Sequence, residues 1–172
     1  MTHASRNTST GLFFESGVKC LNEGINLSKK KLGKYYTEKT GKYYSLSSIR
    51  ANKAKGIPSD KEEKAKMFEG KYLFARALEP DEAYLDEKTN TLIIYEKKFQ
   101  ETEGSADEKL QTSGFKILQY RKLAKELGIE KVKFIYILCD YFKSPYYKDV
   151  LDYIKSIPDC GYYFVEDMNG IK

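Results

Sequence analysis

The sequence of 172 residues is poor in histidine and cysteine, the side chains that often serve in catalysis, metal binding or disulfide bonds. Its one histidine, His3, argues against histidine catalysis, a Ser-His-Asp triad and a histidine metal cage. The three cysteines, Cys20, Cys139 and Cys160, are odd in number and form no CxxC pair. This argues against structural zinc, dithiol redox chemistry and a disulfide framework, and it favours a reduced cytosolic protein.

Other signals are missing as well. No apolar run reaches membrane-spanning length, and residues 1–6 lack the apolar segment of a secretory signal. There is no GxGxxG after a strand and no GxxxxGK[ST] loop, which argues against a nucleotide cofactor and a metabolic enzyme. We therefore expect a soluble, cytoplasmic protein with no membrane partner.

Positive charge is concentrated in one part of the chain. The formal net charge is +5, yet the segment from Lys29 to Lys55 holds nine Lys or Arg and one acid, a local charge of +8. Four tyrosines lie among these cations: Tyr35, Tyr36, Tyr43 and Tyr44. Such a patch favours a polyanionic partner. The alternative is a solvated loop with structural tyrosines.

Length and patterning predict one domain over residues 1–172, with a core at about 11–165 and a basic, Tyr-rich insertion at about 28–60. Helices are predicted over residues 11–21, 106–127 and 146–157, and strands over 72–78, 81–85, 91–99, 132–139 and 161–165. In the long helix, Ser105 and Gly128 are the expected caps. The expected core residues of this helix are Leu110, Phe115, Leu118, Leu123 and Leu127. This order predicts an α/β fold with a mixed sheet flanked by helices.

The predicted hairpin carries the most informative side chains. The polar residues 86–91 allow the strand that starts at Asp81 to fold back on the strand that contains Glu96. Residues two apart on a strand share a face, so Glu96 and Lys98 lie together while Lys97 points away. Two carboxylates close together bind a hard cation such as Mg²⁺, and a lysine beside them can hold a water. This pattern predicts metal-dependent phosphodiester hydrolysis.

Pro80-Asp81 followed by Glu96, Lys97 and Lys98 resembles the motif of the PD-(D/E)XK nuclease superfamily. Residues 96–100 and 104–112 are also similar to stretches of bacterial type II restriction enzymes. The architectural match covers roughly residues 11–165. The resemblance implies a restriction-endonuclease-like fold, with a mixed β-sheet core flanked by helices on both faces. It also implies a Mg²⁺-dependent, sequence-specific endonuclease of double-stranded DNA, with Mn²⁺ as a substitute metal.

The resemblance also implies a role for each matching residue. Asp81, Glu96 and the backbone carbonyl of Lys97 would ligate the metal, and Lys98 would orient and help deprotonate the attacking water. Glu15, on the predicted first helix, would complete the metal site through water.

Two glutamines complete the implied site. Gln100 lies on the same strand face as Lys98 and would contact the scissile phosphate or its water. Gln111, on the long helix, resembles the phosphate-side glutamines of some members.

A chain of this size holds one such centre, so cutting both strands of a duplex favours a homodimer. Residues 47–56 are the candidate DNA-contacting loop, because their side chains suit base edges and phosphates. The contacting residues in this loop are Arg50, Asn52, Lys53 and Lys55.

Several alternatives stay open at this point. Asp81 after a proline can simply open a turn, Glu96 with Lys98 can be an exposed ion pair, and Glu15 can be an ordinary helix glutamate. The other acids near Asp81, such as Glu79 and Glu82, compete for the role of first ligand. The functional alternatives are a structure-specific, repair or nicking nuclease, and a non-catalytic nucleic-acid-binding protein.

Overall fold

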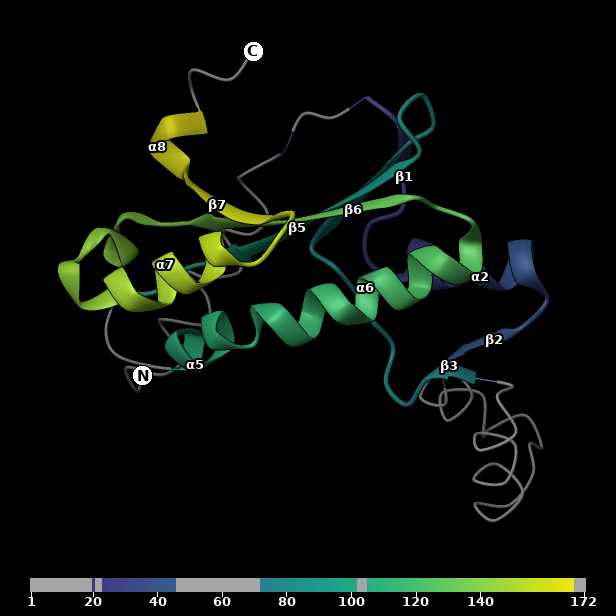
Figure 1. The fold of residues 1–172 in the computed structure, drawn as a ribbon, viewed down its shortest axis with the longest axis horizontal. Helices are drawn as coiled ribbons and strands as arrows, with labels where there is room; N and C mark the ends of the chain where they lie inside the picture. Colours follow the sequence, from purple (N-terminus) through teal and green to yellow (C-terminus); the bar gives the residue numbers. More distant parts are fainter. Residues whose placement is uncertain (1–19, 21–22, 46–71, 102–104, 169–172) are drawn as a thin grey trace, which may run out of the picture.

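The structure, a computed structural model, describes residues 20, 23–45, 72–101 and 105–168 (Figure 1). The predicted first helix with Glu15 lies outside the described residues, apart from its end near Cys20. The candidate DNA loop, with Arg50, Asn52, Lys53 and Lys55, also lies outside them.

A mixed sheet of five strands forms the centre of the described fold, in the order β1-β4-β5-β6-β7. The strands are β1 (Ile25–Asn26), β4 (Glu82–Asp86), β5 (Thr91–Lys98), β6 (Lys131–Leu138) and β7 (Cys160–Phe164). The pairs β1–β4 and β4–β5 are antiparallel, while β5–β6 and β6–β7 are parallel. The predicted α/β class, the hairpin and the buried strand that follows the long helix are therefore confirmed.

A second, two-stranded sheet was not predicted. It pairs β2 (Tyr43–Ser45) in parallel with β3 (Tyr72–Phe74), so the strand expected over residues 72–78 is shorter and does not join the main sheet. Helix α2 (Lys30–Thr40) was also missed. Its buried residues are Leu32 and Tyr36, one helical turn apart among many cations, and two apolar positions give too weak a period to detect.

The turn between β4 and β5 is held by its own polar groups. The Asp86 carboxylate accepts hydrogen bonds from the backbone N–H of Lys88 at 2.9 Å and from the Thr89 hydroxyl at 2.6 Å. The bond from Thr89 lowers the pKa of Asp86. Asn90 has φ 48°, and its side-chain amide donates to the Gly128 carbonyl at 3.1 Å. These bonds fix the length and the direction of the turn.

The helices α5 (Ser105–Gln111), α6 (Ser113–Leu127) and α7 (Lys148–Ser156) lie together on one side of the sheet in Figure 1. Short 3₁₀ turns, η2 (Asp140–Lys143) and η3 (Pro145–Tyr147), connect β6 to α7. The four-residue α8 (Val165–Met168) follows β7 and leads away from this layer. The sheet is thus flanked by helices, as expected, but the three longest helices that follow β5 share one side, whereas helices on both faces were predicted (Figure 1).

The helix expected over residues 106–127 is two helices that break at Thr112. Ser105 begins α5, and Gly128 ends α6 at φ 70° with its N–H on the carbonyls of the last turn, so both predicted boundaries are confirmed. The break changes which residues face the sheet. Phe115 and Leu118 are 66% and 61% exposed, so their assignment to the core is wrong.

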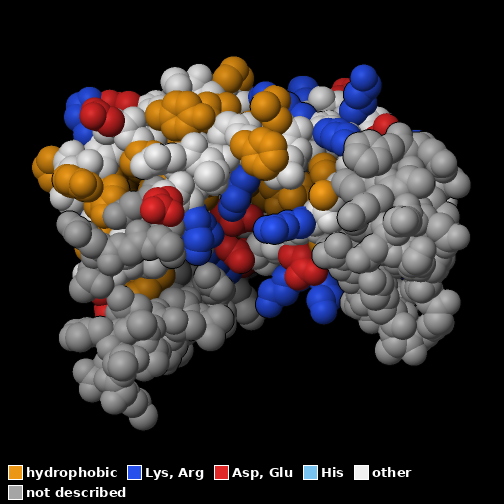
Figure 2. Space-filling model, turned by 90° about the horizontal axis from the view of Figure 1, so that it is seen from below, with side chains coloured by type: hydrophobic (Ala, Val, Ile, Leu, Met, Phe, Trp, Pro, Cys, Tyr) orange, Lys and Arg blue, Asp and Glu red, His pale blue; other side chains and the backbone are white. Residues whose placement is uncertain are grey.

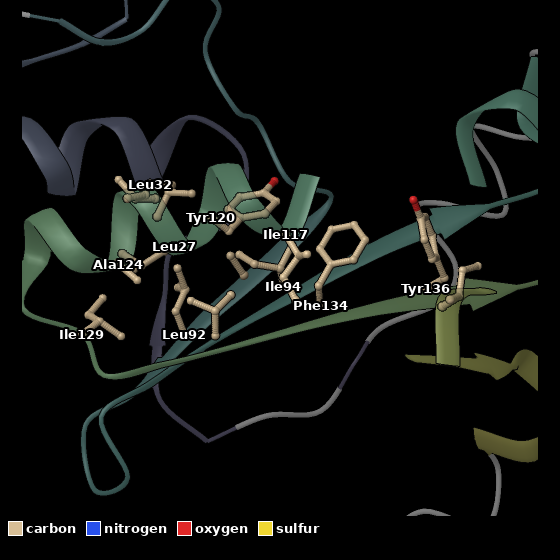
Figure 3. Close-up of a cluster of buried hydrophobic side chains, with 14 of the residues drawn as sticks. Leu27, Leu32, Leu92, Ile94, Ile117, Tyr120, Ala124, Ile129, Phe134 and Tyr136 are labelled. Carbon is tan, nitrogen blue, oxygen red and sulfur yellow. The ribbon is translucent and has the colours of Figure 1, made fainter. Parts of the chain in front are cut away.

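The core lies between the sheet and α6 (Figure 3). Leu92 and Ile94 of β5 and Phe134 of β6 point toward α6, where Ile117 and Tyr120 meet them. The Tyr120 and Phe134 rings stack with their centroids 5.8 Å apart. Alternate residues of the two central strands therefore face α6, as the strand period requires.

Among the described residues, no helix combines the length and the apolar character needed to cross a lipid bilayer.

The exposure pattern of α6 can be tested with two leucines of one helix. Leu123 is fully buried and Leu118 is exposed. Leu123→Ala should lower the free energy of unfolding by about 2–5 kcal/mol because it leaves a cavity. Leu118→Ala should change it by less than about 0.5 kcal/mol. Urea denaturation measures the free energy of unfolding of both variants. Equal losses would contradict the assignment of Leu123 to the buried face of α6 and of Leu118 to its exposed face.

Candidate active site

The register of the β4–β5 hairpin brings the predicted carboxylates together. Glu82 pairs with Tyr95 and Ala83 with Ile94, so one further step of the same register sets Asp81 opposite Glu96. The Asp81 carboxylate accepts a hydrogen bond from the backbone N–H of Lys97 at 2.7 Å. Asp81 is therefore anchored beside the Glu96–Lys98 segment, and it does more than open a turn.

Glu96 has two cationic partners. Its Oε2 atom lies 3.2 Å from the Lys98 ammonium and 3.0 Å from the Lys116 ammonium. The Lys98 ammonium also donates to the Lys97 carbonyl oxygen at 3.0 Å. Glu96, Lys98 and the Lys97 carbonyl thus meet in one cluster, and the Lys97 N–H holds Asp81 on the neighbouring chain segment.

Lys116 was missed in the sequence because the wrong residues of α6 were assigned to the core. With Ile117 and Tyr120 buried, Lys116 lies on the flank of α6 that faces β5. The Ile117–Tyr120–Ala124 spacing was a usable signal, since i, i+3, i+7 marks one face of a helix. Lys116 ties α6 to the acidic centre of the hairpin.

The cluster is largely removed from water. Glu96 is 9% exposed, and the two tyrosines behind it, Tyr120 and Tyr136, are almost fully buried. Burial raises the pKa of both phenols, and the negative charge of Glu96 raises it further. Asp81 also raises the pKa of Tyr120, which places both carboxylates near one ring. Charges in such surroundings interact more strongly than charges in water.

Lys97 points to the opposite face of the sheet, as predicted. It is 3% exposed and forms an ion pair with Glu82, which also accepts a hydrogen bond from the Tyr84 hydroxyl at 2.8 Å. The backbone N–H of Cys20 donates to the same carboxylate at 3.2 Å. Glu82 is therefore committed to a buried network on the far face, which removes it as a rival for the place of Asp81.

Cys20 belongs to that same far-face network. Burial raises the pKa of its thiol to about 12, and the Glu82 charge adds to the shift. The raised pKa disfavours the thiolate, which is the nucleophilic form of cysteine.

The two predicted glutamines have different positions. Gln100 is buried just beyond β5, and its backbone N–H and carbonyl both bond to the Cys139 sulfur, at 3.3 and 3.4 Å. It lies at the same end of the sheet as Lys98, and its contact with a phosphate stays a prediction. Gln111 is exposed at the end of α5, and the described ion pairs of the cluster do not involve it.

The donor atoms suit a hard divalent cation. Within the described part of the chain, no group of three or more His, Cys, Asp or Glu side chains could hold a metal. The candidate set instead combines two carboxylates with one backbone carbonyl. Mg²⁺ typically takes one or two carboxylates and fills its other positions with water and substrate phosphate. The Lys98 ammonium lies between Glu96 and the Lys97 carbonyl, so cationic charge is already favoured there.

Comparisons of the chain with models of protein families, with curated proteins and with solved structures find no match.

The two neighbouring lysines of β5 should behave differently when they are replaced. Lys97→Met leaves Glu82 buried without its cation and should lower the free energy of unfolding by about 3–5 kcal/mol. Lys98→Met leaves Glu96 with Lys116 as a partner, so the loss should be clearly smaller than that for Lys97→Met. Chemical denaturation gives both values. A larger loss for Lys98→Met would contradict the assignment of the two faces.

Proposed function

We propose that the protein is a Mg²⁺-dependent endonuclease that hydrolyses phosphodiester bonds of double-stranded DNA on a restriction-endonuclease-like fold. The observation that carries this proposal is the register of the β4–β5 hairpin, which sets Asp81 opposite Glu96 and next to the Glu96–Lys98 ion pair. A lone structural ion pair lacks a second carboxylate such as Asp81, whereas a divalent cation uses one.

The charges of the cluster explain why a metal would be required. Asp81 and Glu96 carry two negative charges, and Lys98 and Lys116 carry two positive charges, so the four groups balance. A neutral site has no net attraction for a phosphodiester anion. In the proposed enzyme, Asp81, Glu96 and the Lys97 carbonyl hold Mg²⁺. When bound, the metal lowers the pKa of a coordinated water and neutralises charge on the phosphate.

The chain's own residues have separate tasks in this mechanism. Lys98 stands beside the Lys97 carbonyl and Glu96, where its ammonium can hold the attacking water and keep it oriented. Lys116 positions Glu96 from α6. The Lys97 side chain fixes the strand from the far face through Glu82, while its backbone N–H fixes Asp81. Orientation of this kind lowers the entropy cost of the reaction.

Sequence-specific cleavage, as by a type II restriction enzyme, is the form of this activity that we propose. The support is the similarity of residues 96–100 and 104–112 to such enzymes. A homodimer with one centre per strand follows from the geometry of duplex cleavage. A structure-specific, repair or nicking nuclease would use the same cluster.

Removing either central side chain should abolish most activity without unfolding the protein. Glu96→Ala or Lys98→Ala should lower the cleavage rate in Mg²⁺ by about 100-fold or more, because each removes a preorganised charge. Lys116→Ala should cause a smaller loss, because this lysine acts through Glu96. Lys133→Ala is a matched control, since Lys133 is an exposed strand lysine of the opposite face. Rates are measured on supercoiled plasmid, with circular dichroism as the folding check. Near wild-type cleavage by Glu96→Ala or Lys98→Ala would exclude this site.

The class of nuclease can be read from the products. We expect mixed-sequence plasmid DNA to yield discrete bands in Mg²⁺ and none in EDTA. Sequencing of the fragment ends should show one shared sequence. Cuts confined to junctions or lesions would indicate a repair enzyme, and single-strand cuts a nicking enzyme. Salt-sensitive binding with no metal-dependent cut would leave only a non-catalytic DNA-binding protein.

A further inference from the structure

Four exposed lysines surround the start of α2: Lys29, Lys30, Lys31 and Lys34. The chain just before and at this point is fastened to the strand that carries Asp81. Lys29 N–H donates to the Pro80 carbonyl at 2.9 Å, and Leu27 N–H donates to the Ala83 carbonyl at 2.8 Å. The Ser28 hydroxyl accepts from the Ala83 N–H at 3.1 Å. These bonds lie on both sides of Asp81, so the lysine cluster is a fixed neighbour of the candidate active site.

The charges of this cluster are not neutralised by the described protein. Among the described residues, no ion pair involves Lys29, Lys30 or Lys31, and the first turn of α2 has no acid. Lys34 lies 3.7 Å from Glu38, but both side chains are mostly exposed, at 77% and 62%. Water screens such a pair, so it does little to offset the local positive charge.

The placement of these lysines opposes the stability of the helix. The amino-terminal end of a helix carries partial positive charge and favours acids, whereas α2 begins with cations. Lys30 and Lys34 are also like charges four residues apart, which repel one another. A sequence selected only for a stable α2 would place acids or neutral residues there. An anionic partner gives these lysines a use that folding does not.

The backbone conformation of Lys29 is a second, independent observation in favour of a functional role. This residue has φ 54° and ψ −128°, a conformation that glycine adopts far more easily than lysine. Backbone strain of this kind is kept only where the surrounding structure enforces it, and it clusters at functional sites.

Basic side chains also gather on a wider surface of the molecule, beyond the start of α2. Figure 2 shows the molecule from the side on which α6 lies, and there basic side chains gather around a group of acidic side chains. An extended polyanion on this face would lie close to these basic side chains (Figure 2).

From these observations we infer that Lys29, Lys30, Lys31 and Lys34 form a contact surface for the phosphate backbone of the DNA, beside the bond to be cut. The inference rests on the proposed nuclease function and assigns the backbone contacts to side-chain ammonium groups of α2. Contacts to phosphates fix the position of a duplex but carry no sequence information. The surface therefore orients the substrate, while recognition of the sequence is made elsewhere.

The test compares lysines that differ in place but not in charge. The α2 variant is Lys30→Gln/Lys31→Gln/Lys34→Gln, and a second variant is Lys29→Gly. The control is Lys88→Gln/Lys131→Gln/Lys133→Gln, which removes three exposed charges from the turn of the hairpin and the start of β6, at the other end of the strands. Binding of a short duplex is followed by fluorescence anisotropy in EDTA, over a range of salt concentrations. Thermal unfolding is recorded for each protein.

We expect the slope of log K against log[salt] to become shallower by about one for each lysine–phosphate pairing that a variant removes, up to about three for the α2 variant. The weakening of binding should be the same on duplexes of unrelated sequence. Thermal stability should stay unchanged or rise, and Lys29→Gly should raise it because the strain is relieved. The control variant should keep the wild-type slope.

Several results would overturn the inference. If the α2 variant and the control variant have the same salt slope, α2 is not part of the DNA interface. If the α2 variant has lower thermal stability than the wild type, its lysines have a structural role. The outcome is separable from that of the proposed function, because binding is measured without metal. Wild-type protein that shows the α2-dependent slope but never cleaves DNA in Mg²⁺ would refute the nuclease and leave the binding surface.

Discussion

The antiparallel register of β4 and β5 is the constraint on which the candidate site depends. It sets Asp81 opposite Glu96, and the alternation of β5 then sends Glu96 and Lys98 to the α6 side while Lys97 goes to the other side. Each consecutive residue of this strand segment therefore has a different neighbour. The site is built from a regular strand, and not from a flexible loop, which gives its groups fixed directions.

Both faces of β5 carry buried charge, and on each face opposite charges meet. On the far face, Lys97 and Glu82 balance one to one, with the Tyr84 hydroxyl and the Cys20 N–H as further donors. On the near face, Glu96 is shared by Lys98 and Lys116. Isolated charges at these levels of burial would be costly, so each buried carboxylate is met by at least one lysine. The far-face pair completes the network by which the strand is held, and on the near face Lys116 is the most exposed of the three charged groups.

The hairpin and its chemistry could be predicted because they follow from a period of two and from a polar turn. The placement of Asp81, Glu96 and Lys98 could be predicted from the strand pattern and the length of the turn alone. The boundaries at Ser105 and Gly128 could be predicted for a similar local reason. Lys116 was missed because the break at Thr112 shifts the buried face of α6, although the spacing of Ile117, Tyr120 and Ala124 marks that face in the sequence. Phe115 and Leu118 were assigned to the core for the same reason.

The helix α2 and its position could also not be predicted from the sequence pattern. Its two core residues, Leu32 and Tyr36, are too few to reveal a helix among so many lysines. The start of α2 lies near Asp81 because of hydrogen bonds between residues far apart in the sequence, such as the one from the Lys29 N–H to the Pro80 carbonyl. The sequence indicated a polyanion-binding patch between Lys29 and Lys55, but only the fold shows that its first part adjoins the catalytic candidates.

The turn that joins β4 to β5 has a consequence for how this protein can evolve. Asp86, Thr89 and Asn90 fix its length through their hydrogen bonds and the backbone of Asn90. Insertion or deletion of one residue there, if it shifted the pairing by one, would exchange the two sides of the strand. Glu96 and Lys98 would then point to the face on which Lys97 now meets Glu82, and Lys97 would point toward α6. Lineages of this protein should therefore tolerate new side chains in the turn far more readily than a change in its residue count.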